Sequence, residues 1–119
     1  MCNPRGHVLT VRKRGTATFM LPGGKPEPGE APADTALREF AEELGGFLDP
    51  KMLTFWGEFR AAAANEADVE VVAQVFEHPY VHGLRAGSEI EVLEWVDPGE
   101  PRDDMAPLNT LHIFPRLVQ

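Results

Sequence analysis

The sequence predicts a mixed α/β fold for this chain. Three observations support that class: β-prone runs lie on both sides of one long amphipathic helix, a second helical pattern ends the chain, and proline- or glycine-containing loops separate the elements. At 119 residues, with 43% hydrophobic and 25% charged side chains, the chain has the size and composition of a globular protein. We therefore expect one domain, residues 1–119, built around one core.

Two short strands are expected ahead of the long helix. Residues 7–12 form the first β-prone run, and residues 18–21 form a second one after a turn at 13–16. The second run stops at Pro22-Gly23-Gly24, where backbone groups are free to face a ligand. The following loop, residues 25–31, is stiffened by two prolines.

The long helix is predicted over residues 32–44. Pro32 suits the first turn, where a missing N–H costs nothing, and Gly45-Gly46 supplies a left-handed stop. At about 100° per residue, one stripe of the helix is apolar and an adjacent arc is acidic. The stripe holds Ala33, Leu37, Phe40 and Leu44, and the arc holds Glu39, Glu42 and Glu43.

Three more β-prone segments follow the helix. Residues 51–63 are expected to form a strand or a strand pair, residues 69–76 a second strand, and residues 91–96 a last one. A short C-terminal helix is predicted over residues 106–113, stopped by Pro115.

The acidic arc of the long helix is unfavourable unless something neutralises it. Glu39 forms like-charge pairs with Glu42 and Glu43, and each such pair costs roughly 0.2–0.5 kcal/mol in an isolated helix. Arg38 offers the only local relief. An ordinary solvated face is the alternative, but oxygen-only ligands on a rigid element suit Mg²⁺, or Mn²⁺, which also bind phosphates.

The spacing of these residues is the most specific feature of the sequence. It runs from Gly24 through five residues to Glu30, then through seven residues to Arg38-Glu39-Phe40-Ala41-Glu42-Glu43-Leu44-Gly45. Chance agreement at seven fixed positions is on the order of 10⁻⁸ per starting point. The segment closely resembles the catalytic motif of Nudix hydrolases, which use Mg²⁺ to cleave the diphosphate of a nucleoside diphosphate linked to another group.

The resemblance, which covers residues 6–96, implies both a fold and a site. The fold would be an α/β/α sandwich with a mixed β-sheet. By resemblance, Glu42 and Glu43 are metal ligands together with the Gly23 carbonyl, and Glu39 is either a further ligand or the general base. Supporting roles fall to Gly24, and to Glu30 and Arg38, which would pair to fix the loop against the helix.

A further acid from outside the motif completes the site in many family members. Glu89 is the candidate, because it lies six residues before Trp95 in a loop-to-strand segment resembling theirs. Glu77 and Glu91 are the competitors, and a solvated surface acid is the alternative for each.

Charge is distributed unevenly along the chain. All nineteen acidic residues lie from Glu27 onward, whereas residues 1–25 carry only basic ones, and the net charge of −8 argues against general nucleic-acid binding. A basic segment before an acidic helix suits a metal–phosphate substrate. For Arg12, Lys13 and Arg14, a phosphate-binding role and a solvated hairpin surface are both open. Arg12, Arg14 and Lys25 are the residues expected to add positive charge around the phosphates.

Other features bear on location and assembly. The chain has a single cysteine, Cys2, no apolar run of the ~20 residues that a membrane span needs, and no visible leader. These features indicate a cytoplasmic protein without a membrane partner.

Two departures from the family stand out. Gly46 replaces an aliphatic residue, and the usual first strand is missing, so either the start is truncated or another element, such as a second copy in a homodimer, covers the sheet edge.

The sequence therefore predicts a Mg²⁺-dependent pyrophosphohydrolase acting on a small nucleotide-type diphosphate. Nucleoside triphosphates, ADP-ribose and nucleotide sugars are all candidate substrates, because the subfamily markers that would separate them are absent. The alternative is a Nudix-like nucleotide-binding or regulatory module without hydrolysis. Retention of Glu39, Glu42 and Glu43 favours the enzyme.

Overall fold

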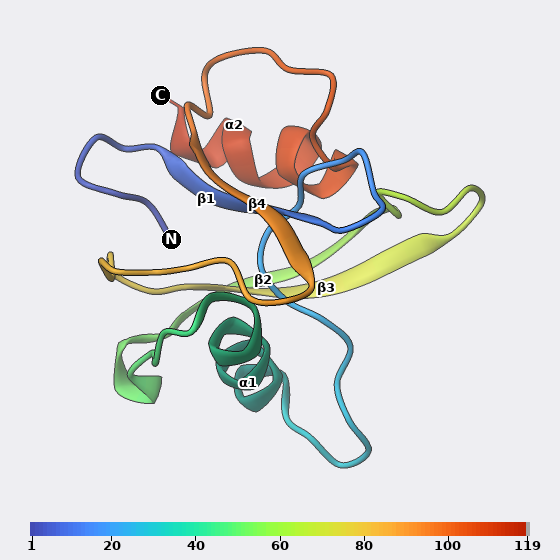
Figure 1. The fold of residues 1–119 in the computed structure, drawn as a ribbon. Coiled ribbons are helices and arrows are strands. Elements are labelled where there is room, and N and C mark those ends of the chain that lie inside the picture. The colour runs from blue at the N-terminus through green and yellow to red at the C-terminus, as the bar shows by residue number, and fades with distance from the viewer. Residues whose placement is uncertain (119) are drawn as a thin grey trace.

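The computed structural model describes residues 1–118 and has helices on both sides of its strands (Figure 1). Helix α1 lies below the strands in this view, and the C-terminal helical segment lies above them. In chain order the elements are β1 (Val8–Lys13), α1 (Pro32–Leu44), the 3₁₀ turn η1 (Pro50–Met52), β2 (Thr54–Ala62), β3 (Glu70–Glu77), β4 (Ile90–Val96), the π-helical turn η2 (Asn109–Ile113) and α2 (Phe114–Leu117).

The strands form two antiparallel pairs, β1 with β4 and β2 with β3. The predicted strand at residues 18–21 is not a full strand. It is reduced to two isolated bridges, one antiparallel between Met20 and Val11 and one parallel between Phe19 and Met105. Phe19 and Met20 pair with different segments of the chain, and Pro22, which cannot donate a backbone hydrogen bond, lies two residues after Met20. No continuous ladder therefore develops.

Alternation along β1 divides the core into two clusters. Leu9 and Val11 face α1, where they pack with Phe40, Leu44 and Ile90. Val8 faces the other way and packs with buried side chains from the C-terminal region: Phe19, Val96, Met105, Ile113 and Phe114. Burial of one such side chain contributes about 1.5–3 kcal/mol. This packing makes α1 a rigid support for whatever its opposite face carries.

The bounds of α1 agree with the sequence prediction. Pro32 lies in the first turn, and Gly45 adopts the left-handed conformation at φ 68° while donating its N–H to the Ala41 carbonyl. The predicted segment at 51–63 begins instead with the 3₁₀ turn and continues as one strand, β2.

The prediction that Pro115 stops the C-terminal helix is wrong. The helical segment continues through Pro115 to Leu117, directly after the π-helical turn in which Phe114 donates its N–H to the Asn109 carbonyl. A proline inside a helix removes one hydrogen bond and crowds the preceding turn. The wider π turn just ahead of Pro115 absorbs that distortion.

The outer edge of β1 is partly covered from within the chain. The Leu9 N–H donates to the Met1 carbonyl at 3.0 Å, and Val11 and Met20 exchange two hydrogen bonds of 2.8 Å. At these positions the edge already has a partner and needs none from a second copy. No helix among residues 1–118 combines the length and apolar character required to cross a membrane.

Candidate functional site

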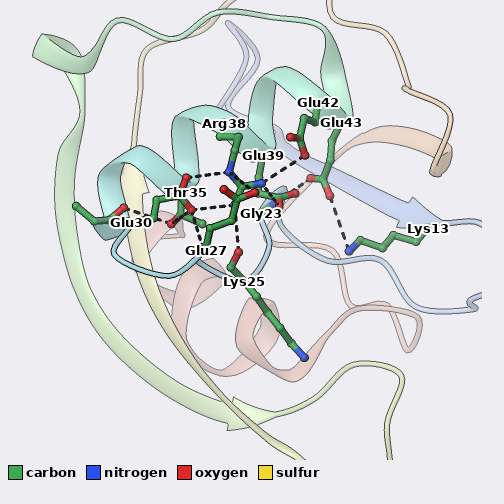
Figure 2. A network of polar contacts seen from close by, with 11 residues as sticks. Lys13, Gly23, Lys25, Glu27, Glu30, Thr35, Arg38, Glu39, Glu42 and Glu43 are labelled. Atoms are coloured by element: carbon green, nitrogen blue, oxygen red, sulfur yellow. Dashed lines mark hydrogen bonds and ion pairs between the residues drawn. The ribbon is translucent and has the colours of Figure 1, made fainter.

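Arg38 connects the loop before α1 to the acidic arc of the helix (Figure 2). Its guanidinium forms a forked pair with Glu30, with both N–O distances at 2.8 Å. It also donates to Glu39 at 2.8 Å and to Glu42 at 3.5 Å, and to the Lys25 carbonyl at 3.2 Å. One side chain thus ties the loop to two of the three glutamates.

Glu30 is held in its ionised form. Its carboxylate accepts hydrogen bonds from Arg38, from the Glu27 N–H at 3.0 Å and from the Thr35 hydroxyl at 2.8 Å. These bonds, led by those of Arg38, lower the pKa of Glu30 to about 2. The Glu30–Arg38 pair that the sequence suggests is therefore present, and it fixes the loop against α1.

The surroundings of Glu43 favour its protonated form, in contrast to those of Glu30. It is 3% exposed; its Oε1 accepts the Gly23 N–H at 2.9 Å, but its buried Oε2 has no hydrogen-bond partner. Burial raises the pKa of Glu43 to about 7, helped by the charges of Glu39 and Glu89 and opposed by the Gly23 bond and Lys13. A buried carboxylate oxygen without a partner is costly unless a cation satisfies it.

Gly24 makes room for Glu39. A Cβ on Gly24 would lie 2.5 Å from Cδ of Glu39, so the carboxylate rests directly against the glycine backbone. The side chain of Glu39 is 17% exposed and that of Glu42 is 59% exposed. The three glutamates therefore differ in solvent access: Glu43 is buried, Glu39 is half-buried and Glu42 is open.

The three candidates for the distal acid lie in different surroundings. Glu89 is near enough for its charge to act on Glu43. Glu91 instead pairs with Arg14. Glu77 lines a separate cavity with Cys2 and His78. Glu89 is thus the candidate whose charge helps to raise the pKa of Glu43.

Three cations expected to contact phosphate, Arg12, Arg14 and Lys25, do not point at the glutamates of α1. Arg12 donates to the Thr16 carbonyl at 2.7 Å and lies over the Phe19 ring. Arg14 donates to the Ser88 carbonyl at 2.7 Å besides pairing with Glu91. The side chain of Lys25 extends away from the carboxylate network, as Figure 2 shows.

The cation nearest to Glu43 is Lys13, the remaining member of the basic cluster at residues 12–14. Its Nζ lies 3.9 Å from the unpaired Oε2. Strand β1 extends to Lys13, one residue past the predicted strand, so Lys13 has the same parity as Leu9 and Val11, which pack toward α1. Arg12, at the opposite parity, is directed to the other face.

The donor chemistry of the site suits a hard divalent cation, although the carboxylates are not gathered around one point. Within residues 1–118, no group of three or more His, Cys, Asp or Glu side chains is arranged to hold a metal ion. Arg38 engages Glu39 and Glu42, and Lys13 approaches Glu43. Oε2 of Glu43, which accepts no hydrogen bond, is the atom that a metal would satisfy, and the carboxylates of α1 offer the oxygen donors that Mg²⁺ prefers.

Comparison with known proteins identifies the family. The family model described as the NUDIX domain matches residues 1–117. The chain belongs to the NUDIX family. The predicted family membership is thereby confirmed.

Curated NUDIX relatives match the chain over different lengths. A MutT-like protein from Streptomyces ambofaciens is 29% identical over 113 residues, covering 94% of this chain and 69% of the relative. Nudix hydrolase 3 from Caenorhabditis elegans is 38% identical over 58 residues, or 49% of this chain. The matched part is only 22% of that relative's length. An RNA pyrophosphohydrolase from Photorhabdus laumondii is 39% identical over 54 residues, which cover 44% of this chain and 31% of that protein.

Solved NUDIX structures share the fold. A MutT NUDIX hydrolase from Burkholderia pseudomallei superposes with a TM-score of 0.78 at 22% identity, covering 99% of this chain and 92% of that one. The MutT protein from Methanosarcina mazei gives 0.76 at 22% identity, covering 98% and 86%. The predicted α/β fold class is confirmed by these neighbours.

Proposed function

We propose that this NUDIX chain is a divalent-metal-dependent pyrophosphohydrolase that cleaves the diphosphate bond of a nucleoside diphosphate linked to another group. The observation that carries the proposal is the burial of Glu43. Its carboxylate is 3% exposed, and one of its oxygens accepts no hydrogen bond. Burying a charged group in this way, beside two further glutamates, lowers the stability of the fold. A carboxylate kept in such unfavourable surroundings is typical of a functional site.

Mg²⁺ is the proposed cofactor, with Mn²⁺ as a substitute. Glu42, Glu43, the Gly23 carbonyl and Glu89 are the proposed ligands, and Glu39 serves as a further ligand or as the general base. The metal, when bound, supplies charge to shield the diphosphate oxygens and activates water. The protein's own contribution is rigidity: the Gly23 N–H orients Glu43, and Arg38 orients the carboxylates of Glu39 and Glu42.

Lys13 is the proposed first cation for the substrate phosphates. Its Nζ lies 3.9 Å from the proposed metal ligand Glu43, and its side chain is 37% exposed, so a phosphate bound at Glu43 would be within its reach. Arg12, Arg14 and Lys25 remain candidates for the outer phosphates. The first two would have to release the Thr16 carbonyl and Glu91, respectively.

The substrate is proposed only as a class: a nucleoside triphosphate, ADP-ribose or a nucleotide sugar. The similar proteins are named for different substrates: one relative is an RNA pyrophosphohydrolase, and one solved neighbour is an Ap4A hydrolase from Caenorhabditis elegans. That neighbour has a TM-score of 0.58 at 19% identity, covering 77% of this chain and 69% of its own. General nucleic-acid binding and membrane association are not part of the proposal. A cytoplasmic location and a homodimer stay predictions.

The test is hydrolysis of a substrate panel with Mg²⁺ at slightly alkaline pH. The panel contains normal and oxidised deoxynucleoside triphosphates, ADP-ribose, nucleotide sugars and dinucleoside polyphosphates. Release of phosphate or nucleotide that disappears with EDTA, and also in the Glu43→Gln variant, would support the proposal. Tight nucleotide binding by folded protein without turnover would instead favour a binding module.

A further inference from the structure

The segment at residues 84–89 packs on the C-terminal end of α1. The Arg85 N–H donates to the Leu44 carbonyl at 3.1 Å, and the Gly87 N–H donates to the Glu43 carbonyl at 2.7 Å. Carbonyls in the last turn of a helix have no partner within the helix and must find one elsewhere. The segment therefore caps the helix end that carries the acidic arc, in addition to the cap supplied by Gly45.

Gly87 lies so close to α1 that no side chain fits. A Cβ at this position would be 2.7 Å from the Glu42 carbonyl oxygen and 3.0 Å from that of Glu43. Both atoms belong to the helix backbone and cannot rotate away. The glycine is thus required by close approach of two backbones. Any larger residue must lift the segment off the helix.

The same segment carries Glu89, whose backbone is held on two sides. The Ile90 N–H donates to the Gly87 carbonyl at 3.0 Å, which closes a turn that contains Glu89. At the end of β1, the Arg14 N–H donates to the Glu89 carbonyl at 3.0 Å, and the Arg14 side chain donates to the neighbouring Ser88 carbonyl at 2.7 Å. One anchor is the helix and the other is the strand.

We infer that Gly87 is a positioning residue, which fixes Glu89 beside the carboxylates of α1 by docking its segment on the helix backbone. This inference rests on the proposed metal-dependent function, because it gives Glu89 a rigid place in the same unit as Glu42 and Glu43. A residue that acts by orienting a ligand typically changes metal affinity by about 10- to 100-fold when replaced. The effect of replacing Gly87 on metal affinity must also depend on the presence of Glu89, the ligand that it orients.

The test is a double-mutant cycle on Mn²⁺ affinity, measured by calorimetric titration without substrate. Gly87→Ala and Glu89→Gln are each expected to weaken Mn²⁺ binding by about tenfold. The double variant should bind no more weakly than Glu89→Gln alone, since a misplaced glutamine has no affinity left to lose. Gly99→Ala is the matched control, because a Cβ there meets no atom closer than 3.4 Å.

Each result decides the inference. Additive losses in the double variant, or wild-type affinity in Gly87→Ala, would overturn it while leaving the metal function intact. Absence of Mn²⁺ binding by the wild-type protein would overturn the proposed function as well. If circular dichroism shows Gly87→Ala to be unfolded, Arg14→Gln replaces it in the cycle. This variant removes the Arg14 side-chain bond to the Ser88 carbonyl without a clash and keeps the backbone bond to Glu89. The same non-additivity with Glu89→Gln is required, because the proposal places Glu89 through this docked segment.

Discussion

Replacing Glu43 by glutamine is expected to stabilise the metal-free protein at alkaline pH while lowering its turnover at least a hundredfold. The wild-type side chain is 3% exposed with an unpaired Oε2, and its pKa is raised from 4.5 to about 7. The native state therefore keeps a proton that the unfolded chain loses at lower pH. Stability from this group is complete below about 4.5 and is lost as the pH rises through about 7.

The size of the effect follows from the pKa difference. The pKa of Glu43 is 4.5 in the unfolded chain and about 7 in the native state. At about 1.36 kcal/mol per pH unit, and with the unfolded chain already largely ionised at pH 5, the loss of stability between pH 5 and pH 8 is about 2.5 kcal/mol. Glutamine is neutral throughout, so its own packing cost cancels when the two pH values are compared. For a domain of this size, about 2.5 kcal/mol corresponds to roughly 10 °C in Tm.

The assay is thermal unfolding of wild type and Glu43→Gln in EDTA at pH 5 and pH 8. The Tm of the variant relative to wild type should rise by roughly 10 °C between the two pH values. Glu42→Gln is the control, because Glu42 is 59% exposed and its replacement should show no such change. An equal gap at both pH values would refute the reasoning. Near-normal turnover of Glu43→Gln with Mg²⁺ would refute the site assignment.

Three further predictions concern the surroundings of Glu43. Gly24→Ala should lower turnover at least tenfold with little change in Tm, because the flexible Glu39 carboxylate, 2.5 Å from the new Cβ, moves instead of the backbone; a matched fall in Tm would argue for general damage. Lys13→Met should raise KM for the substrate at least fivefold, and an unchanged KM measured by initial rates would remove Lys13 from the phosphate site. Glu89→Gln should lower turnover more than Glu91→Gln does, and the reverse order would reassign the distal ligand.

The helix that carries the site could be predicted closely from sequence because its signals are local. Pro32 and Gly45 mark its two ends, and the apolar stripe with Phe40 and Leu44 gives its buried face. The pairing of Glu30 with Arg38 also follows from a motif of fixed spacing. The end of the C-terminal helix does not follow from sequence, since the general rule for Pro115 gives no warning of a π turn that accommodates it.

Residues that act through close tertiary approach could not be found in this way. Nothing local distinguishes Gly87, which touches the helix backbone, from Gly83, which has open space around its Cβ position. Lys13 belongs to the basic cluster at 12–14 that the sequence indicates for phosphate binding. Its direction toward Glu43 could not be predicted, because it depends on β1 extending one residue beyond the predicted strand at 7–12.

The structure also changes the electrostatic argument for a metal. From sequence, like-charge repulsion among the three glutamates indicated a missing cation. Arg38 already neutralises much of it, with 2.8 Å and 3.5 Å contacts to Glu39 and Glu42. The buried Oε2 of Glu43 accepts no hydrogen bond, and its ion-pair partner Lys13 lies 3.9 Å away. The case for Mg²⁺ therefore depends on the burial of one carboxylate more than on the number of acids. This is why Glu43→Gln at two pH values is a sharper test than removal of the more exposed Glu42.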